Sequence, residues 1–326
     1  MLSLWLISIL LAAPVGRVLK LEELSVRDLE SLDREKTLFV LTFGNLEEHG
    51  PYLPVGSDYF LATGLRDALV ERLRVRHPER DFILVPVVPL GEGGANDFAG
   101  QPDHIGTFAV RFETLRHVAI DLGAAVAKKG FHNIFLVHLH ANPLHSIAFT
   151  DAADYVSERY RVRMVNLTSL ILGRGIYAEE VMDKHLGKNW QEQTGLDTHS
   201  GAAETSAILY LRGDLVKPEH RGAPPFKVKN MSEVLRTAER SDWPGYWGGP
   251  ALARPEIGKE LMDRFAEIGV EIAGRALAGE DLSALPVYPE SPPPIPEMTA
   301  FERSLRERYA RESADIETWL ARRKPK

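Results

Sequence analysis

The 326-residue chain contains no cysteine. A disulfide bridge, a thiolate metal ligand and a cysteine nucleophile are therefore all excluded. The chain does contain 11 histidines and 46 aspartates and glutamates. Any metal ion that this protein binds must therefore be held by imidazole and carboxylate side chains.

Positive charge is also in short supply. The chain has 39 lysines and arginines against 46 aspartates and glutamates, which gives a formal net charge of −7 at pH 7. Proteins that bind nucleic acid need a basic surface to pair with phosphates, so we expect no nucleic-acid partner. Hydrophobic residues make up 44% of the chain, and a chain of this length and composition can bury one large core.

The apolar run at residues 2–13 is too short to cross a bilayer as an ordinary helix, but it has the length of the hydrophobic region of a signal peptide. No lysine or arginine precedes the run and no clean A-x-A cleavage site follows it, so a hydrophobic segment packed on the domain is the alternative. We expect residues 1–16 to be a signal peptide and the protein to be secreted or periplasmic. Without export it would be cytoplasmic. We expect no membrane span in the mature chain.

Apolar runs and amphipathic stretches alternate along the rest of the chain. Residues 37–42, 81–88 and 131–137 are predicted strands, because they are short, apolar and rich in β-branched and aromatic residues. Residues 115–129 and 261–272 have apolar positions at helical spacing. This alternation predicts an α/β fold of three layers, α/β/α, with a mostly parallel sheet. In such sheets ligands bind at the carboxyl ends of the strands.

Glu47 and His49 stand directly after the predicted strand 37–42. Residues i and i+2 of an extended segment point to the same side, so these two side chains share one face. Two glycines and two prolines between positions 50 and 56 bend the chain back, so that Asp58 can return to that face. Two carboxylates and an imidazole that converge at a strand end suit a divalent transition metal. A solvated surface turn is the alternative for a bare Glu-x-His pair.

Two further segments with the same chemistry favour the metal site. His138 and His140 follow directly after the predicted strand 131–137, and His199 and Glu204 lie at the start of a later helical stretch. Each of these groups stands at a strand end or a helix start, where the predicted fold places its ligands. Together they indicate one site of metal-assisted chemistry.

These segments also carry a resemblance to a known family. Residues 47–58 resemble the E-Q-H-G-P-H-L-P-L-G-T-D signature of the creatininase family of metal-dependent amidohydrolases. Residues 197–206 resemble that family's D-x-H-A-G-x-x-E-T-S motif, and His140 falls where its N-G-H-x-x-N motif places a histidine. The similarity runs from about residue 21 to residue 279 and implies a creatininase-like hydrolase domain over residues 17–284. Because the family forms oligomers, it also implies a homo-oligomer.

The resemblance implies two adjacent metal sites. Glu47, Asp58 and His140 would hold one divalent ion, and His49 and Asp58 would face a second, with Asp58 as the bridge. Glu204 would belong to the metal shell, although a role in orienting the catalytic histidine or in accepting a proton from water is also open. The expected cofactor is zinc, with manganese as the alternative at the second site.

The activity implied by the resemblance is hydrolysis of a non-peptide C–N bond, in a cyclic or linear small-molecule amide, by a metal-activated water. His199 would be the catalytic proton carrier to the leaving nitrogen, because an imidazole titrates near pH 6.5. A peptidase-like member that trims a small peptide is one alternative. A non-catalytic exported binding protein on the same fold is another.

The second motif departs from the family pattern. Creatininase has a glutamate ligand at the position of Asn142, whose neutral amide is a poor substitute. His138 shares a face with His140, and either replaces that ligand or is a core histidine with a backbone partner. His145, just after this motif, is a candidate for a contact that supports the ligands. The glycine-rich residues 90–100 predict a mobile loop near the site, and His104 follows as a substitute for the family's loop histidine. The number of metal ions is therefore open.

The C-terminal residues 285–326 lie outside the resemblance. They comprise a proline-rich linker at 286–296 and a predicted amphipathic helix at 299–323. The helix has one apolar stripe, which we expect to dock on this chain or on a neighbouring subunit. The stripe consists of Phe301, Leu305, Tyr309, Ile316 and Leu320.

Overall fold

A computed structural model of the chain describes residues 15–98, 105–175, 178–238, 240, 242–291 and 293–323. Residues 1–14, on which the expectation of export depends, lie outside these ranges, and so does His104. Both expectations therefore stay predictions. No helix within the described ranges is long and apolar enough to cross a membrane.

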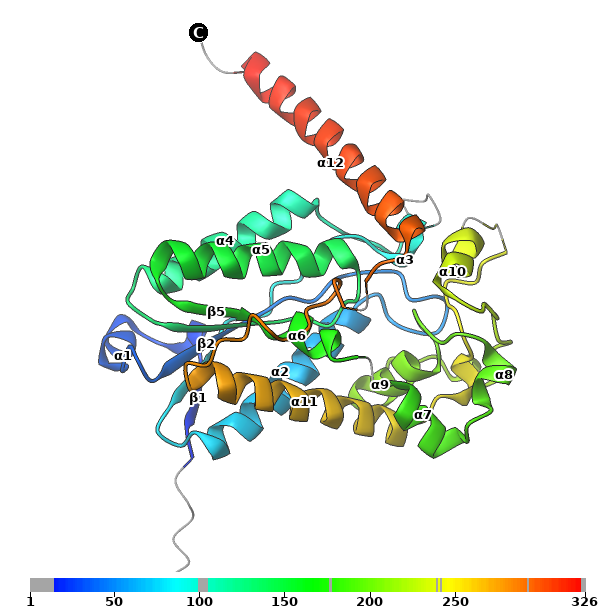
Figure 1. Cartoon of the computed structure of the whole chain (residues 1–326), viewed down its shortest axis with the longest axis horizontal. Helices are drawn as coiled ribbons and strands as arrows, with labels where there is room; N and C mark the ends of the chain where they lie inside the picture. Colours follow the sequence, from blue (N-terminus) through cyan, green and yellow to red (C-terminus); the bar gives the residue numbers. More distant parts are fainter. Residues whose placement is uncertain are drawn as a thin grey trace, which may run out of the picture.

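A parallel sheet forms the centre of the molecule (Figure 1). In the described part of the chain it has five strands, and each pair of neighbours is parallel, which confirms the predicted fold class. Strand β3 is shorter than the predicted strand 81–88, although the N–H groups of Val85 and Val88 still donate to carbonyls of β2 at 3.1 and 2.9 Å. In spatial order the strands are β1 (Arg17–Lys20), β3 (Asp81–Leu84), β2 (Thr37–Thr42), β4 (Asn133–Val137) and β5 (Arg163–Asn166).

Helices cover both faces of this sheet, with α4 and α5 on one side and α2 and α11 on the other (Figure 1). The first helices are α1 (Val26–Ser31), α2 (Ser57–Arg76), α3 (Ala95–Phe98), α4 (Phe112–Ala127), α5 (Pro143–Tyr160) and α6 (Leu167–Gly173). The remainder are α7 (Ala178–Leu186), α8 (Trp190–Thr194), α9 (Ala202–Arg212), α10 (Met231–Ala238), α11 (Pro255–Leu277) and α12 (Pro296–Arg323).

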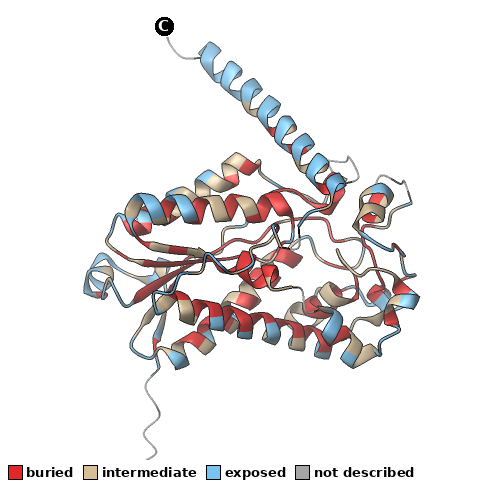
Figure 2. Cartoon of the chain, viewed as in Figure 1, coloured by how far each residue is buried: buried red, intermediate tan, exposed pale blue. Residues whose placement is uncertain are grey.

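Strand β2 shows why the sheet needs a cover on both sides. Its residues are all buried (Figure 2), and successive side chains of a strand point to opposite faces. Leu38 and Val40 belong to the apolar core formed with α2 and α11. Phe39 and Leu41 belong to the core formed with α4 and α5. The strand is therefore apolar throughout, as is typical of a parallel sheet between two helical layers.

The pairing of β2 with β4 brings two of the sequence motifs together. Thr42 at the end of β2 pairs with Val137 at the end of β4. The chain that leaves each strand, residues 43–56 and 138–142, therefore emerges at the same edge of the sheet. Chemistry-bearing side chains from separate motifs meet there.

Helix α12 docks with its first half and projects from the body with its second half (Figure 2). Leu305 and Tyr309 are buried in the core beside α4 and α5, and Phe301 packs against the same core. Ile316 and Leu320 are 40% and 42% exposed. The predicted stripe thus docks on this chain along its first three positions, and the expectation of a neighbouring subunit stays a prediction.

Candidate metal centre

The site lies where β2, β4 and α9 converge. The chain that leaves β2 carries Glu47 and His49, turns at Gly50, where φ is +64°, and enters α2 with Asp58 in its first turn. A positive φ favours glycine, because it lacks a Cβ that would clash with the backbone. This turn places Asp58 against the face that Glu47 and His49 share, as the sequence predicts.

Glu47, Asp58 and His140 form one group that could hold a metal ion. His140 Nδ1 lies 3.0 Å from Glu47 Oε2 and 3.1 Å from Asp58 Oδ2, and the three side chains are buried. The other ring nitrogen, Nε2, donates to the backbone carbonyl of Glu92 at 3.2 Å. In the neutral imidazole that bond leaves the lone pair of Nδ1 aimed at the two carboxylates.

His49, Asp58 and Glu204 form a second group of this kind, which shares Asp58 with the first. His49 Nε2 lies 3.7 Å from Asp58 Oδ1 and 3.6 Å from Glu204 Oε1. Its Nδ1 donates to the backbone carbonyl of Glu47 at 3.0 Å, so its lone pair too faces carboxylates. Glu204 is held in place by the backbone N–H of Ser200, which donates to Oε2 at 2.6 Å.

These donors fit a bound cation. An imidazole lone pair and a carboxylate oxygen both accept, so they repel each other at these distances unless a proton or a metal ion lies between them. Burial alone lowers the pKa of His49 and His140, but the facing carboxylates outweigh it and hold both pKa values well above the usual range. Buried His49 Nε2 has no hydrogen-bond partner within the described residues. Zinc or manganese suits such a set of imidazole and carboxylate ligands.

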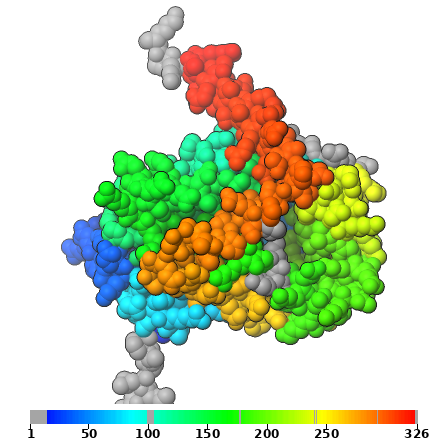
Figure 3. Space-filling model, viewed as in Figure 1, coloured from blue at the N-terminus to red at the C-terminus, as the bar shows by residue number. Residues whose placement is uncertain are grey.

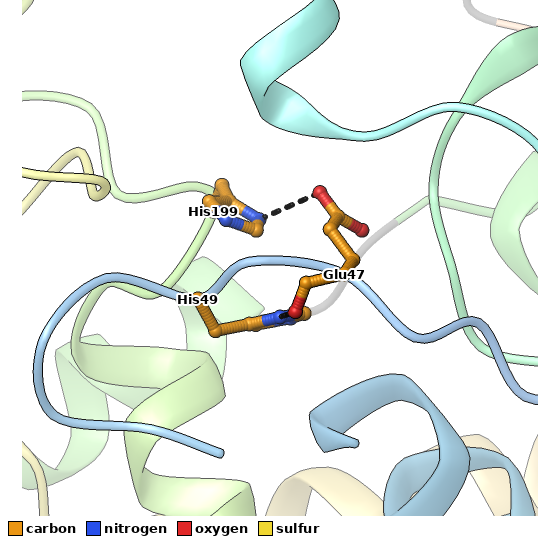
Figure 4. A group of neighbouring side chains, drawn as sticks. All are labelled: Glu47, His49 and His199. Carbon is orange, nitrogen blue, oxygen red and sulfur yellow. Dashed lines mark hydrogen bonds and ion pairs between the residues drawn. The ribbon is translucent and has the colours of Figure 1, made fainter. Parts of the chain in front are cut away.

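His199 lies beside both groups and joins Glu47 and His49 in a third combination that could bind a metal (Figure 4). Its Nε2 donates to the backbone carbonyl of Glu48 at 2.8 Å, and its Nδ1 lies 3.6 Å from Glu47 Oε1. Burial lowers the pKa of His199, but the nearby carboxylates, that of Glu47 foremost, outweigh burial, so the pKa lies above its usual value. Nδ1 is therefore the nitrogen that can exchange a proton.

His138 belongs to none of the candidate metal groups in the described part of the chain. Its ring packs 4.9 Å from His145 and 5.0 Å from Phe149, measured between ring centroids. Burial lowers the pKa of His138 to about 3, so this ring is neutral. Of the two interpretations left open by the sequence, the structure matches the core histidine, although neither ring nitrogen has the expected hydrogen-bond partner among the described residues. Asn142 does not reach the metal groups either, because its side chain caps α5 by accepting from the N–H of Leu144 at 3.0 Å.

Of the polar residues that hold the first group from outside, the sequence singled out His145 but gave no such role to Glu92 or Tyr309. Glu92 carries the carbonyl that orients His140, and the ring of His145 accepts from the Glu92 N–H at 3.1 Å. The Glu92 carboxyl in turn accepts from the hydroxyl of Tyr309 at 2.7 Å. Residues 91–97, expected to be mobile, are buried. The spacing of glycines in the sequence gave no signal for these contacts with α12.

A cavity of about 260 Å³ opens over the candidate ligands. Its lining includes Glu47, Asp58, His140, His199 and Glu204. A larger cavity of about 1010 Å³ lies along β5 and contains none of these residues. The chemistry of the ligands, and not cavity size, therefore identifies the functional site.

The family model for creatininase, described as creatinine amidohydrolase, matches residues 22–273 of this chain. The chain belongs to the creatininase family. Members of this family are metal-dependent amidohydrolases, so the protein is a metal-dependent hydrolase with this fold. The match lies inside the predicted domain 17–284 and ends before the linker that precedes α12.

Among curated relatives, this member of the creatininase family is similar to two named mycofactocin precursor peptide peptidase. The protein of Mycobacterium ulcerans (strain Agy99) is 22% identical over 273 residues, which cover 81% of this chain and 96% of the relative. The protein of Mycobacterium tuberculosis (strain ATCC 25618 / H37Rv) is 24% identical over 259 residues, which cover 76% and 88%.

Solved structures show the same fold. A crystal structure of creatinine amidohydrolase has a TM-score of 0.58 at 19% identity and covers 79% of this chain and 97% of its own. A putative creatinine amidohydrolase from Bacteroides fragilis NCTC 9343 has a TM-score of 0.54 at 18% identity and covers 81% and 98%. The three-layer arrangement predicted from the sequence is therefore that of creatininase.

Proposed function

We propose that this protein hydrolyses a non-peptide C–N bond in a small cyclic or linear amide, with zinc in the first ligand group and zinc or manganese in the second. One observation carries the proposal: Asp58 belongs to both ligand groups and is buried between them. A carboxylate has two oxygens, so one residue can bridge two ions.

The residues have separate roles in this reaction. Glu47 and His140 would complete the first ion's shell, and His49 and Glu204 that of the second. Bound ions would supply Lewis acidity toward the amide carbonyl and toward water. His199, which lines the cavity, would carry a proton to the leaving nitrogen through Nδ1, since Nε2 donates to the carbonyl of Glu48.

Cleavage of a short peptide is the second candidate. The relatives named mycofactocin precursor peptide peptidase favour it, because they cover most of this chain. The same ligands and the same proton carrier would serve either reaction, since both break a C–N bond next to a carbonyl. Substrate screening must therefore include short peptides beside cyclic and linear amides.

The first test is the substitution Asp58→Asn. We expect the unmodified protein, purified without chelators, to contain up to two zinc or manganese ions per chain and to hydrolyse a member of the panel. Loss of the shared carboxylate should remove both ions and reduce hydrolysis to background. Elemental analysis and amide hydrolysis measure the two effects on the same sample.

The matched control is Asp67→Asn, the same substitution at an exposed position of the same helix. It should leave metal content and hydrolysis unchanged. An unmodified protein that binds neither ion, even after either ion is added, would contradict the proposal. A protein that binds metal and amides but hydrolyses none of the panel would be a binding protein on this fold.

A further inference from the structure

The cavity over the metal ligands has two kinds of wall. Its floor carries the carboxylates and imidazoles of the site, whereas apolar side chains such as Met231, Met262 and Phe265 form much of the rest. None of the lining residues that the structure describes is a lysine or an arginine. Away from the metal ligands and His199, a carboxylate on the substrate would therefore meet no cationic side chain among these residues, and it would lose its hydration without a partner.

Two lining residues, Tyr288 and Met298, come from the part of the chain beyond the family match, which ends at residue 273. The Tyr288 hydroxyl donates to the carbonyl of Ala141 at 2.5 Å, and its backbone N–H donates to the carbonyl of Ser169 at 2.9 Å. Met298, near the start of α12, is 7% exposed. Figure 3 shows this orange segment lying across the surface of the domain. The C-terminal segment is thus anchored as part of the cavity wall.

Helix α12 also contacts α3, which contributes a second part of the cavity wall. The ring of Phe301 lies 4.7 Å from the ring of Phe98, which lines the cavity at the end of α3. Arg308 Nη1 donates to Asp97 Oδ1 at 2.9 Å, which forms a partly buried ion pair. Helix α3 and the buried loop before it are therefore held between the metal ligands and the C-terminal helix.

We propose that the C-terminal segment 285–309 makes this cavity a binding site for a compact, uncharged apolar group. This inference rests on the proposed function and specifies its substrate class: a neutral amide that carries a short aliphatic or aromatic group. The cavity has a volume of about 260 Å³. At about 30 Å³ for each water-sized group, it has room for a ligand of roughly nine such groups. Each methylene buried there gains affinity by leaving water.

Straight-chain hydroxamic acids test the proposal, because their head group binds metal ions and their tail enters the cavity. We would measure the affinity of acetohydroxamic, butanohydroxamic and hexanohydroxamic acid for the zinc-loaded full chain by calorimetry. The dissociation constant should fall about fourfold for each added methylene. A probe of the hexano length that ends in a carboxylate should bind at least about tenfold more weakly than hexanohydroxamic acid, because its charge is desolvated without a partner.

The substitution Met298→Ala should weaken hexanohydroxamic acid several-fold while acetohydroxamic acid keeps its affinity. Met298→Leu, which conserves the volume of the side chain, should keep the wild-type preference for hexanohydroxamic acid over acetohydroxamic acid. Leu320→Ala, on the exposed half of the same helix, is the control that should change neither probe. Equal affinity for all tails, or no loss on adding the carboxylate, would overturn this inference and leave the hydrolase intact. Failure to bind zinc and acetohydroxamic acid at all would instead overturn the proposed function, and this inference with it.

Discussion

At the scale of single residues, the site depends on backbone carbonyls that fix the orientation of imidazoles. His49, His140 and His199 each donate one ring N–H to a main-chain oxygen, which leaves the opposite nitrogen facing carboxylates. Such outer partners select the tautomer and hold the ring in place. His199 also lies near two carboxylates, those of Glu47 and Glu48, but it belongs to neither of the two groups that share Asp58. We therefore propose it as the proton carrier rather than as a ligand.

The substitution His199→Ala should lower kcat about 10²- to 10⁴-fold, the usual contribution of a proton carrier, without changing metal content. His140→Ala should instead lose at least one ion, because it removes a ligand from the first group. Steady-state hydrolysis and elemental analysis of both variants check this. Loss of metal from the His199 variant to the same extent would make His199 a ligand rather than a proton carrier.

At the scale of elements, α12 and the loop of residues 90–98 form one unit although they are far apart in the sequence. Burial raises the pKa of Glu92 to about 7, with the Tyr309 hydroxyl opposing the rise. Burial likewise raises the pKa of Asp97, and the guanidinium of Arg308 opposes it. Each of these buried carboxyl groups thus receives a donor from the helix. The helix satisfies polar groups that its absence would leave unpaired.

The substitution Tyr309→Phe should lower the free energy of unfolding by about 1–3 kcal/mol, because it leaves the buried Glu92 carboxyl without its donor. Urea denaturation at neutral pH measures the change. The control is Tyr155→Phe at a half-exposed position of α5, where a change within about 0.5 kcal/mol is expected. An equal effect of both substitutions would show that the contact with Glu92 contributes nothing.

At the scale of the whole molecule, the metal centre makes stability depend on pH. The folded metal-free protein raises the pKa of His49 and His140, through the carboxylates that outweigh their burial. Their contribution to the free energy of unfolding is therefore fully present below about pH 6.5, the pKa of a histidine in the unfolded chain. It is lost as the pH rises through the higher pKa values that these histidines have in the folded protein. Burial raises the pKa of Glu204, but the charge of His49 outweighs it and lowers that pKa to about 2. The contribution of Glu204 is lost as pH falls below the unfolded pKa of about 4.5.

Metal binding should offset the stability that the metal-free protein loses at alkaline pH. Ions must displace the protons on His49 and His140, so the rise in melting temperature on adding zinc should be larger at pH 8.5 than at pH 5.5. Thermal unfolding with and without zinc measures it. His132→Gln, at a histidine outside the site whose side chain is 42% exposed, should keep this pH dependence. A zinc-induced rise of the same size at both pH values would contradict protonation of these ligands in the metal-free fold.

Local sequence determined the strands and the three site motifs. An apolar, β-branched run such as residues 37–42 must be buried wherever it lies, and alternation along a strand is fixed by backbone geometry. The pairing of Glu47 with His49 and the return of Asp58 follow from extended geometry and a turn within a few residues. These features need no distant contact, so the sequence predicts them.

Tertiary structure alone decided which candidates reach the site. His138 and His140 have the same local spacing, yet only His140 belongs to a candidate metal group of the described residues. The bonds from α12 to Glu92 in the loop before α3 and to Asp97 in α3 join residues that are 217 and 211 positions apart. Such contacts depend on how helices pack across the sheet, and no local periodicity encodes that packing. The family motifs therefore predicted the residues that form the candidate metal groups, whereas the wall of the cavity emerged from the packing of the C-terminal helix.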